Sequence, residues 1–249
     1  MTTYIAYEGP SLYDGAPIVV LVQLETTNRK TGDMVQTYII RSDIDPVTAS
    51  RTGQDSAICG NCPHMGKPNL TSDKGQALGR SCYVTLAHGP LAKYKAYKAG
   101  KYTHAIGHDR IRALGLGRMV RLGTYGDPAS VPSYVWESLI SAAQGWTAYT
   151  HGATNPMPQQ IMTSADSLAQ AESAWAKGER TFRVISDLAA IVKGKEVLCP
   201  ASIEAGARAT CDSCKLCAGA SVKGKSVAIV AHGISKRAAL SNINQSEKV

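Results

Sequence analysis

The sequence predicts an α/β protein built on a whole or partial (β/α) barrel, with a β-hairpin near its start. Short apolar strands alternate with amphipathic helices after residue 79, an order typical of parallel strands joined by right-handed crossovers. Six or seven such strands are expected, and no dinucleotide glycine fingerprint accompanies them, which favours a barrel over a Rossmann sheet. The 249 residues are enough to bury one sizeable core.

The hairpin is expected over residues 18–41, where two apolar runs flank a polar turn. A polar, turn-rich segment follows to about residue 80 and carries the first cysteines. A loop of this length is usually functional or tied to something rigid. We therefore divide the chain into an N-terminal hairpin with the first cysteine-rich loop, residues 1–80, and a barrel-like domain, residues 81–249, with a C-terminal four-cysteine loop.

The elements of the predicted barrel are placed by their apolar pattern. The residues before position 168 are a good source of N-caps for the helix that follows, and residues 242–249 are expected to fray. The expected strands are 82–87, 119–122, 147–150, 160–163, 181–185, 196–199 and 227–231, and the expected helices are 91–98, 109–114, 131–143, 168–177 and 235–241.

Composition predicts a cytoplasmic protein with an anionic partner. The net charge of +8 favours a polyanion, nucleic acid first. The opening residues lack the basic start and apolar run of an export signal, and no stretch approaches the ~20 apolar residues that span a bilayer. No membrane contact is expected, and thiols in the cytoplasm stay reduced.

The seven cysteines are expected to be metal ligands. Their odd number and the reducing compartment argue against a full set of disulfides. The C-terminal group pairs a remote Cys199-Pro200 with the C-x2-C-x2-C run of Cys211, Cys214 and Cys217. Bacterial ferredoxins use this run and a remote cysteine followed by proline, although there the remote ligand comes after the run. An iron–sulfur cluster of the 4Fe-4S type is favoured, and zinc is the alternative.

The N-terminal group has three cysteines, Cys59, Cys62 and Cys82. Three thiolates can hold a four-iron cluster and leave one iron open to bind a small molecule. Alternatively, His64, two residues after Cys62, completes a zinc or mixed site. Cysteines used only as small core residues would be scattered through strands and helices, whereas all seven fall into these two groups.

Polar residues recur where the predicted strands end, and parallel α/β folds bind ligands outside these carboxyl ends. Gly123 and Gly126, with Asp127 beside them, would let the backbone approach a cofactor closely. Helix capping is the alternative role for several residues at these ends. The residues expected to bind substrate or move protons are Asp127, His151, Asp166, Arg183, Glu204 and His232.

The densest basic region lies between residues 93 and 121, with three tyrosines interleaved. Basic side chains next to aromatic platforms suit single-stranded or flipped nucleic acid. A solvated helix face is the alternative interpretation. The residues expected to contact nucleic acid are Lys93, Lys95, Lys98, Lys101 and Arg118.

Four motifs carry a resemblance to known proteins: Cys59-Gly-Asn-Cys-Pro, Ser81-Cys-Tyr-Val, Gly126-Asp-Pro and Cys199-Pro-Ala-Ser-x-Glu. Over most of the chain they resemble an uncharacterised family of phage and bacterial proteins. More distantly, the chain is similar to radical S-adenosylmethionine enzymes. That resemblance implies a partial (β/α) barrel, a three-cysteine cluster with an open iron, an auxiliary C-terminal cluster and a cofactor contact at residues 123–128. The chain departs from the usual compact C-x3-C-x2-C motif, because nineteen residues separate Cys62 from Cys82.

Three functions are compatible with these features. The first is an iron–sulfur enzyme, radical S-adenosylmethionine-like, that acts on a nucleotide or nucleic-acid base and needs an electron donor. The second is a nucleic-acid-binding protein without catalysis, in which iron–sulfur or zinc sites are structural. The third, a metal-dependent hydrolase or lyase, ranks last because the chain has no HExxH or paired-aspartate motif.

Overall fold

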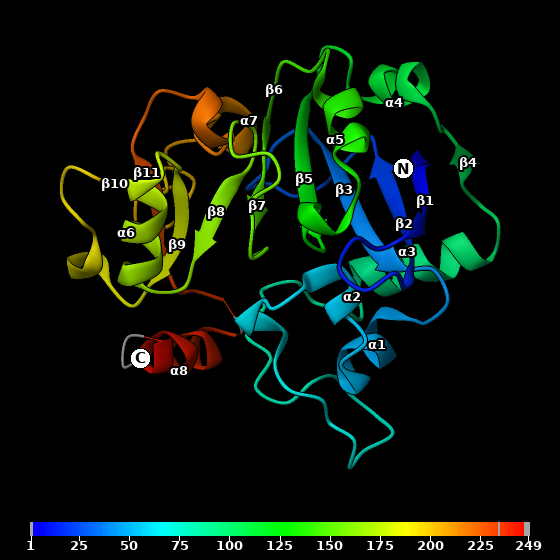
Figure 1. Ribbon diagram of the computed structural model, residues 1–249, viewed down its shortest axis with the longest axis horizontal. Coiled ribbons are helices and arrows are strands. Elements are labelled where there is room, and N and C mark those ends of the chain that lie inside the picture. Colours follow the sequence, from blue (N-terminus) through cyan, green and yellow to red (C-terminus); the bar gives the residue numbers. More distant parts are fainter. Residues whose placement is uncertain (1, 234, 247–249) are drawn as a thin grey trace.

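The computed structural model describes residues 2–233 and 235–246 and is a mixed α/β protein with two β-sheets. Figure 1 shows the sheets side by side, with the segment that carries the first cysteines (cyan) below the N-terminal sheet. Within the described residues the strands do not close on themselves. The expectation of a whole barrel is therefore wrong, because both sheets end in edge strands.

The first sheet is mixed and has the order β4-β1-β2-β3-β5-β6. The predicted hairpin is confirmed: β2 and β3 pair antiparallel from Ile18↔Arg41 to Gln23↔Gln36. β5 pairs parallel to β3, so this sheet takes strands from both sides of residue 80. The strands are β1 (Thr3–Pro10), β2 (Pro17–Gln23), β3 (Met34–Arg41), β4 (Thr103–His104), β5 (Met119–Tyr125) and β6 (Gly145–Thr147).

The second sheet is parallel throughout and has the order β10-β11-β9-β8-β7. Its strands lie close to the predicted ones, because short β-branched and apolar runs bounded by turns are a strong strand signal. The strands are β7 (Tyr149–Thr150), β8 (Met162–Ala165), β9 (Thr181–Ile185), β10 (Glu196–Leu198) and β11 (Ser226–Val230).

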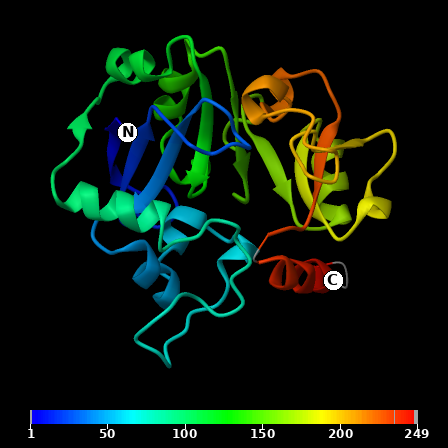
Figure 2. The same cartoon turned by 180° about the vertical axis from the view of Figure 1, so that it is seen from behind.

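The chain passes from one sheet to the other at a single residue, Ala148. β6 ends at Thr147 beside β5, and β7 begins at Tyr149 beside β8. The buried Ala148 donates its amide to the carbonyl of Cys217 at 2.9 Å and accepts from the amide of Met162 at 3.0 Å. The strand order thus continues across the junction, which Figure 2 shows from behind.

Side-chain caps and turn residues set several helix ends. Asp45 accepts hydrogen bonds from the amides of Val47 and Thr48, and α1 stops at Gly53 with a left-handed φ of 77°. Ser167 caps α6 through the amide of Gln170, as the sequence predicts. The α-helices are α1 (Pro46–Thr52), α2 (Ser56–Cys59), α3 (Gly89–Lys98), α4 (His108–Gly115), α5 (Ser133–Ile140), α6 (Leu168–Ala176), α7 (Cys211–Cys214) and α8 (Lys236–Ser246), and the 3-10 turns are η1 (Pro63–Met65), η2 (Pro128–Ser130), η3 (Leu188–Ala190) and η4 (Gly219–Ser221).

The main core lies around the first sheet. β2 buries Ile18 to Val22 completely, and α5 adds Trp136 and Leu139 from one face. The indole of Trp136 donates to the carbonyl of Pro128 at 2.8 Å, so its one polar atom is satisfied. This core includes residues of β3 and β5, the two strands that lead to the site.

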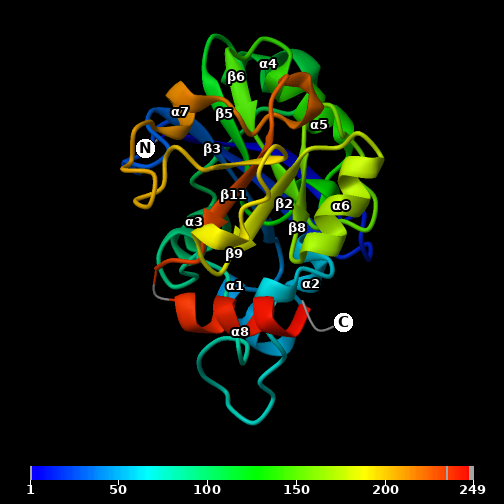
Figure 3. The same ribbon diagram turned by 90° about the vertical axis from the view of Figure 1, so that its left-hand side faces the viewer.

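Two sequence expectations are corrected. Residues 82–87 form turns and bends rather than a strand, because Cys82 is tied to the His64 carbonyl instead of to a neighbouring strand. The expected frayed tail is helical in α8 up to Ser246, and residues 247–249 lie outside the described residues. Figure 3 shows α8 running below the second sheet. No described helix combines the length and apolar character needed to cross a membrane.

Candidate metal and ligand site

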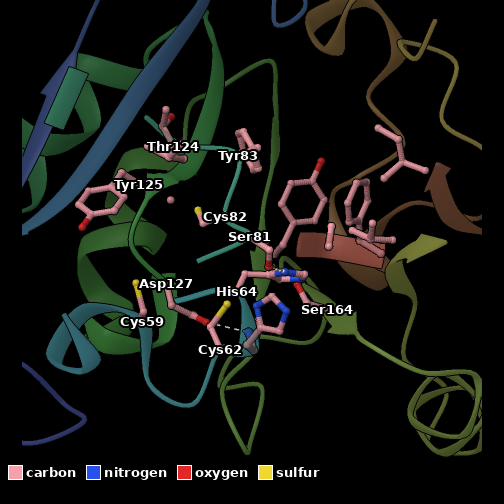
Figure 4. Close-up of a pocket in the computed structure, with 18 of the residues that line it drawn as sticks. Cys59, Cys62, His64, Ser81, Cys82, Tyr83, Thr124, Tyr125, Asp127 and Ser164 are labelled. Carbon is pink, nitrogen blue, oxygen red and sulfur yellow. Dashed lines mark hydrogen bonds between the residues drawn. The ribbon is translucent and has the colours of Figure 1, made fainter. Parts of the chain in front are cut away.

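The three N-terminal cysteines line one cavity of about 340 Å³ at the carboxyl ends of the strands. Cys59 ends α2, Cys62 precedes η1, and Cys82 lies in the loop before α3. Figure 4 shows their three sulfur atoms around a shared space beside Tyr125 and Asp127. The three cysteines therefore share one cavity, and their role as ligands of one metal centre stays a prediction.

Backbone hydrogen bonds explain how the distant Cys82 joins the other two. The amide of Cys82 donates to the carbonyl of His64 at 3.0 Å, and the amide of Cys62 donates to the carbonyl of Cys59 at 3.2 Å. An isolated β-bridge between Lys67 and Leu78 closes the intervening loop. The nineteen residues between Cys62 and Cys82 thus form a folded loop that brings Cys82 back beside His64.

Burial and mutual proximity control the protonation of these thiols. Burial raises the pKa of Cys59 well above its ordinary value, and the neighbouring charges of Asp55, Cys62 and Cys82 raise it further. Burial also raises the pKa of Cys82, although the Arg80 guanidinium opposes the shift. A thiolate ligand has to lose its proton, so metal binding here would be linked to proton release.

A second constellation on the cavity wall joins His64, His151 and Asp166. The Nε2 atoms of His64 and His151 lie 3.3 Å and 3.2 Å from Oδ1 of Asp166. Burial opposes ionisation of the carboxyl, but the hydrogen bonds from both histidines hold the pKa of Asp166 well below its usual range. Burial likewise opposes charge on His151, yet the Cys62 thiolate and Asp166 raise the pKa of His151 well above its ordinary value.

The predicted residue Asp127 organises this wall. Its carboxylate accepts from the amide of Ala129 at 2.9 Å, the hydroxyl of Thr150 at 2.6 Å and the amide of His151 at 2.7 Å. These three donors fix the end of β7 and the backbone of His151. Helix capping, the alternative weighed for such positions, describes one of its contacts, because Asp127 caps η2.

Two cysteines of the C-terminal group, Cys199 and Cys211, line the same cavity. Cys199 follows β10 and donates its amide to the carbonyl of Ala228 at 2.8 Å. Cys199 and Cys217 are buried in an apolar cluster against which Cys211 packs. Burial, reinforced by the three other cysteines, raises the pKa of Cys217 to about 12, while a hydrogen bond from Tyr149 opposes the shift.

Sulfur spacing bears on the choice of metal. Four thiolates on one tetrahedral zinc, with bonds of about 2.3 Å, lie about 3.8 Å from one another. In the part of the chain that the structure describes, the set whose ligand atoms all lie within 4.8 Å of one another is His64, His151 and Asp166, and no set of three cysteine sulfurs does so. Neither cysteine group has the spacing of a mononuclear zinc site.

Aromatic and cationic side chains complete the cavity, and sequence reasoning missed most of them. Tyr83, Tyr149 and Phe182 provide ring faces, and Arg121 lines the cavity close to Cys211. Arg121 is 8% exposed, donates to the Tyr83 hydroxyl, and has a buried Nε without a partner among the described residues. The available signals were the position of Tyr83 directly after Cys82 and the places of Arg121 and Tyr149 at the ends of expected strands.

Several predicted site residues do not reach the cavity. Arg183 is buried in an ion pair with Glu196 at 2.7 Å and does not line the cavity, because its guanidinium turns toward β10. Glu204 is exposed on the loop after β10.

His232 lines the cavity and lies 3.5 Å from Lys30. Gly123 and Gly126 also line it, and a Cβ on Gly126 would lie 2.7 Å from that of Ile39.

The predicted nucleic-acid residues lie away from the cavity. Lys93 packs against the rings of Tyr38 and Tyr102 and donates to the hydroxyl of Thr3 at 3.0 Å. Arg118 donates to the carbonyl of Leu24 at 2.5 Å. None of Lys93, Lys95, Lys98, Lys101 and Arg118 is among the residues that line the cavity of the described chain.

Comparison with protein-family models, with curated proteins and with solved structures finds no match for this chain.

Proposed function

We propose that the protein is an iron–sulfur enzyme in which Cys59, Cys62 and Cys82 hold a 4Fe-4S cluster with one open iron position. The observation that carries this proposal is the convergence of three cysteines from a long loop on one ligand-sized cavity. S-adenosylmethionine is the proposed molecule at the open position, and a nucleotide or nucleic-acid base is the proposed substrate. Because such clusters need reducing conditions, we place the protein in the cytoplasm.

The strand order supports a partial (β/α) barrel. β3, β5, β6 with β7, β8, β9 and β11 follow one another in the chain and neighbour one another in parallel, with β10 outside β11. The three-cysteine loop follows the first of these strands, and Gly123 to Asp127 end the second. The resemblance to radical S-adenosylmethionine enzymes implies this same placement.

The residues present fit an iron–sulfur cluster. Thiolates are the ligands that iron–sulfur clusters take, and the sulfurs are spaced more widely than one metal ion requires. The buried Arg80 supplies positive charge beside Cys59 and Cys82, which would balance an anionic cluster. Its Nε and the Oδ2 of Asp55 have no hydrogen-bond partner among the described residues. When bound, such a cluster supplies the electron that cleaves S-adenosylmethionine reductively.

The chain's own residues would bind and orient the ligands. The faces of Tyr83, Tyr149 and Phe182 suit stacking with a purine, worth about 1–3 kcal/mol per base. Arg121 and Lys30 suit a carboxylate or phosphate at the second sheet's side of the cavity. His151, held by Asp127 and Asp166, is placed to hold or move a proton.

The second candidate is a nucleic-acid-binding protein with structural metal sites. The net charge of +8 and the exposed Lys95, Lys98 and Lys101 favour it. Binding of single-stranded DNA, duplex DNA or RNA should then weaken steeply with salt. Absence of binding to all three at low salt rejects this candidate.

Anaerobic reconstitution tests the proposal. The protein should turn brown and absorb visible light at about 400 nm, as iron–sulfur proteins do. With a reductant, it should release 5′-deoxyadenosine from S-adenosylmethionine. Cys82→Ala, reconstituted in parallel, should give the background level of product. A cluster-loaded wild-type protein that makes no more product than this variant contradicts the proposed chemistry, and a colourless zinc-loaded protein contradicts the cluster.

A further inference from the structure

The trio of His64, His151 and Asp166 has the composition and spacing of a metal site in its own right. One nitrogen from each histidine and one carboxylate oxygen lie within 4.8 Å of one another. The two rings meet edge to face and do not stack, with centroids 5.7 Å apart. Their Nε2 atoms both approach Oδ1 of Asp166. The three residues come from η1 and from the ends of β7 and β8.

We propose that these three side chains bind one divalent first-row transition metal ion beside the three-cysteine set. Ligands at about 2.1 Å from a metal lie about 3.0 Å apart in octahedral and about 3.4 Å apart in tetrahedral coordination. The observed separations of 3.2 Å and 3.3 Å lie between these values. Two histidines and one carboxylate with open positions are typical of Fe²⁺ sites, and Co²⁺ and Zn²⁺ accept the same ligands.

The neighbours of the trio hold it in a ligand-like arrangement. Nδ1 of His64 lies 2.7 Å from the hydroxyl of Ser81, which accepts from the side-chain amide of Asn242 at 2.9 Å. The backbone amide of His151 is fixed by the carboxylate of Asp127 at 2.7 Å. Metal-binding histidines usually have such a partner on the second ring nitrogen, which orients the ring and fixes its tautomer.

The site would be open on one side. All three residues line the cavity, and their side chains are 15–20% exposed. The remaining coordination positions therefore face the space where a substrate would lie. An oxygen of a phosphate, carboxylate or hydroxyl group is the ligand class that suits these positions. The inference does not depend on a cluster at Cys59, Cys62 and Cys82, because it uses a different set of ligands.

Cobalt titration of the anaerobically reconstituted protein, treated with a chelator to remove Fe²⁺ bound outside the cluster, tests the site. One equivalent of Co²⁺ should bind beyond the iron content and show ligand-field absorption without thiolate-to-cobalt charge transfer. Asp166→Asn and His64→Gln should each weaken this binding at least tenfold, and Ser81→Ala should weaken it about tenfold as a change behind a ligand does. His104→Gln is the matched control, because His104 also lies 3.3 Å from a carboxylate, that of Glu8, but at the exposed surface.

The cobalt titrations of the wild type and the variants decide whether the trio binds a metal ion. Binding that is lost in Asp166→Asn and His64→Gln and retained in His104→Gln supports the site, provided that circular dichroism shows folded variants. If these two variants fail to fold, Ser81→Ala carries the test. No cobalt beyond the iron content means that the trio is a hydrogen-bonded His–Asp–His network, and thiolate charge transfer places the ion on cysteines. Either outcome overturns the proposal, and neither affects 5′-deoxyadenosine formation, which tests the cluster.

Discussion

Both cysteine groups contribute to the lining of one cavity, the first with all three cysteines and the second with Cys199 and Cys211, but they are built in different ways. Cys59, Cys62 and Cys82 belong to one loop between β3 and β5, which is held together by its own backbone hydrogen bonds. The C-terminal four come from a strand end, a short helix and the segment after it, and they are pinned to other parts of the chain. The amide of Cys211 donates to the carbonyl of Lys30 in the hairpin turn at 3.0 Å.

Their surroundings differ as well. The three-cysteine set has ionisable neighbours, with Arg80 and Asp55 behind it and His151 beside it. Cys199 and Cys217 of the four-cysteine set are buried in an apolar cluster with Met162 and Val227, and the charges near this set, Lys30 and Arg121, approach it at Cys211. Ionisable groups close to a site suit catalysis, whereas a closed apolar set suits structure or electron transfer. The proposed function places the chemistry on the three-cysteine side, and the two cysteine substitutions below test that assignment.

The largest effect is expected from Cys82→Ala. Removal of one of three thiolates should reduce 5′-deoxyadenosine formation to background and lower the iron content, with a small change in melting temperature. The fold should survive, because the loop keeps its backbone hydrogen bonds to His64 and across the Lys67–Leu78 bridge. Product formation, iron content and thermal unfolding are measured on the same preparation.

Cys214→Ala should show the opposite balance. The segment between Cys199 and Cys217 has few regular elements besides α7, so metal binding would supply folding free energy that the segment lacks. This variant should lose more thermal stability than Cys82→Ala. Equal losses of stability with unchanged metal stoichiometry in both variants would remove the distinction between the two groups.

Arg183→Met should destabilise the four-cysteine side by about 3–5 kcal/mol, because it leaves the carboxylate of Glu196 buried without its partner. Glu196 begins β10, which ends directly before Cys199. Chemical denaturation measures the loss. The double variant Arg183→Met with Glu196→Leu is the control and should recover most of the stability, since no buried charge remains. A double variant as unstable as the single one would locate the cost in packing rather than in charge.

For Arg183, the sequence predicted the strand but not the partner of the side chain. Strand 181–185 was predictable with its bounds, because its apolar pattern is strong. The pattern does not specify that Arg183 turns toward Glu196, a partner on a strand that lies beyond β11 in the sheet. The prediction of a strand at residues 82–87 was wrong for a related reason. The alternation of Val84 and Leu86 is typical of a strand, but strand formation also needs a neighbouring strand with free backbone groups.

The candidate site was predictable in part of its lining and not in its contacts. The seven cysteines form two groups in the sequence, and five of them line the cavity, whereas their role as metal ligands stays a prediction. The contact between His64 and Asp166 joins residues on two separate elements, η1 and the end of β8, and no local pattern marks it. His64 was considered as a partner of the cysteines, whereas the structure places it with His151 and Asp166.

A smaller effect is expected at Tyr83, which lies between the two groups and is 66% exposed. If its ring stacks on a purine, Tyr83→Ala should weaken ligand binding by about 1–3 kcal/mol, or roughly 5- to 150-fold. Tyr83→Phe keeps the ring and loses only the contact with Arg121, so it should cost less. Binding of S-adenosylmethionine and of nucleotides is measured by calorimetry. Equal weakening by both substitutions would assign the effect to the hydroxyl.

The smallest effect concerns Lys93, which lies under the first sheet and away from both cysteine groups. Burial lowers the pKa of Lys93 from 10.5 to about 8. The unfolded chain therefore keeps this proton to a higher pH than the folded chain does, and stability should rise as the pH increases from about 8 to about 10.5. Below this window both states are protonated, and the contribution is constant.

Lys93→Met should flatten this part of the stability profile, measured by urea denaturation at several pH values. The groups that face the ammonium are the rings of Tyr38 and Tyr102 and the hydroxyl of Thr3. Burial raises the pKa of both tyrosines above 10, so they stay neutral over most of the window. Lys95→Met, on the exposed face of α3, is the control and should leave the slope unchanged. A slope that survives in Lys93→Met would mean that another group titrates there, and Lys93 would then be free to contact nucleic acid as the sequence predicted.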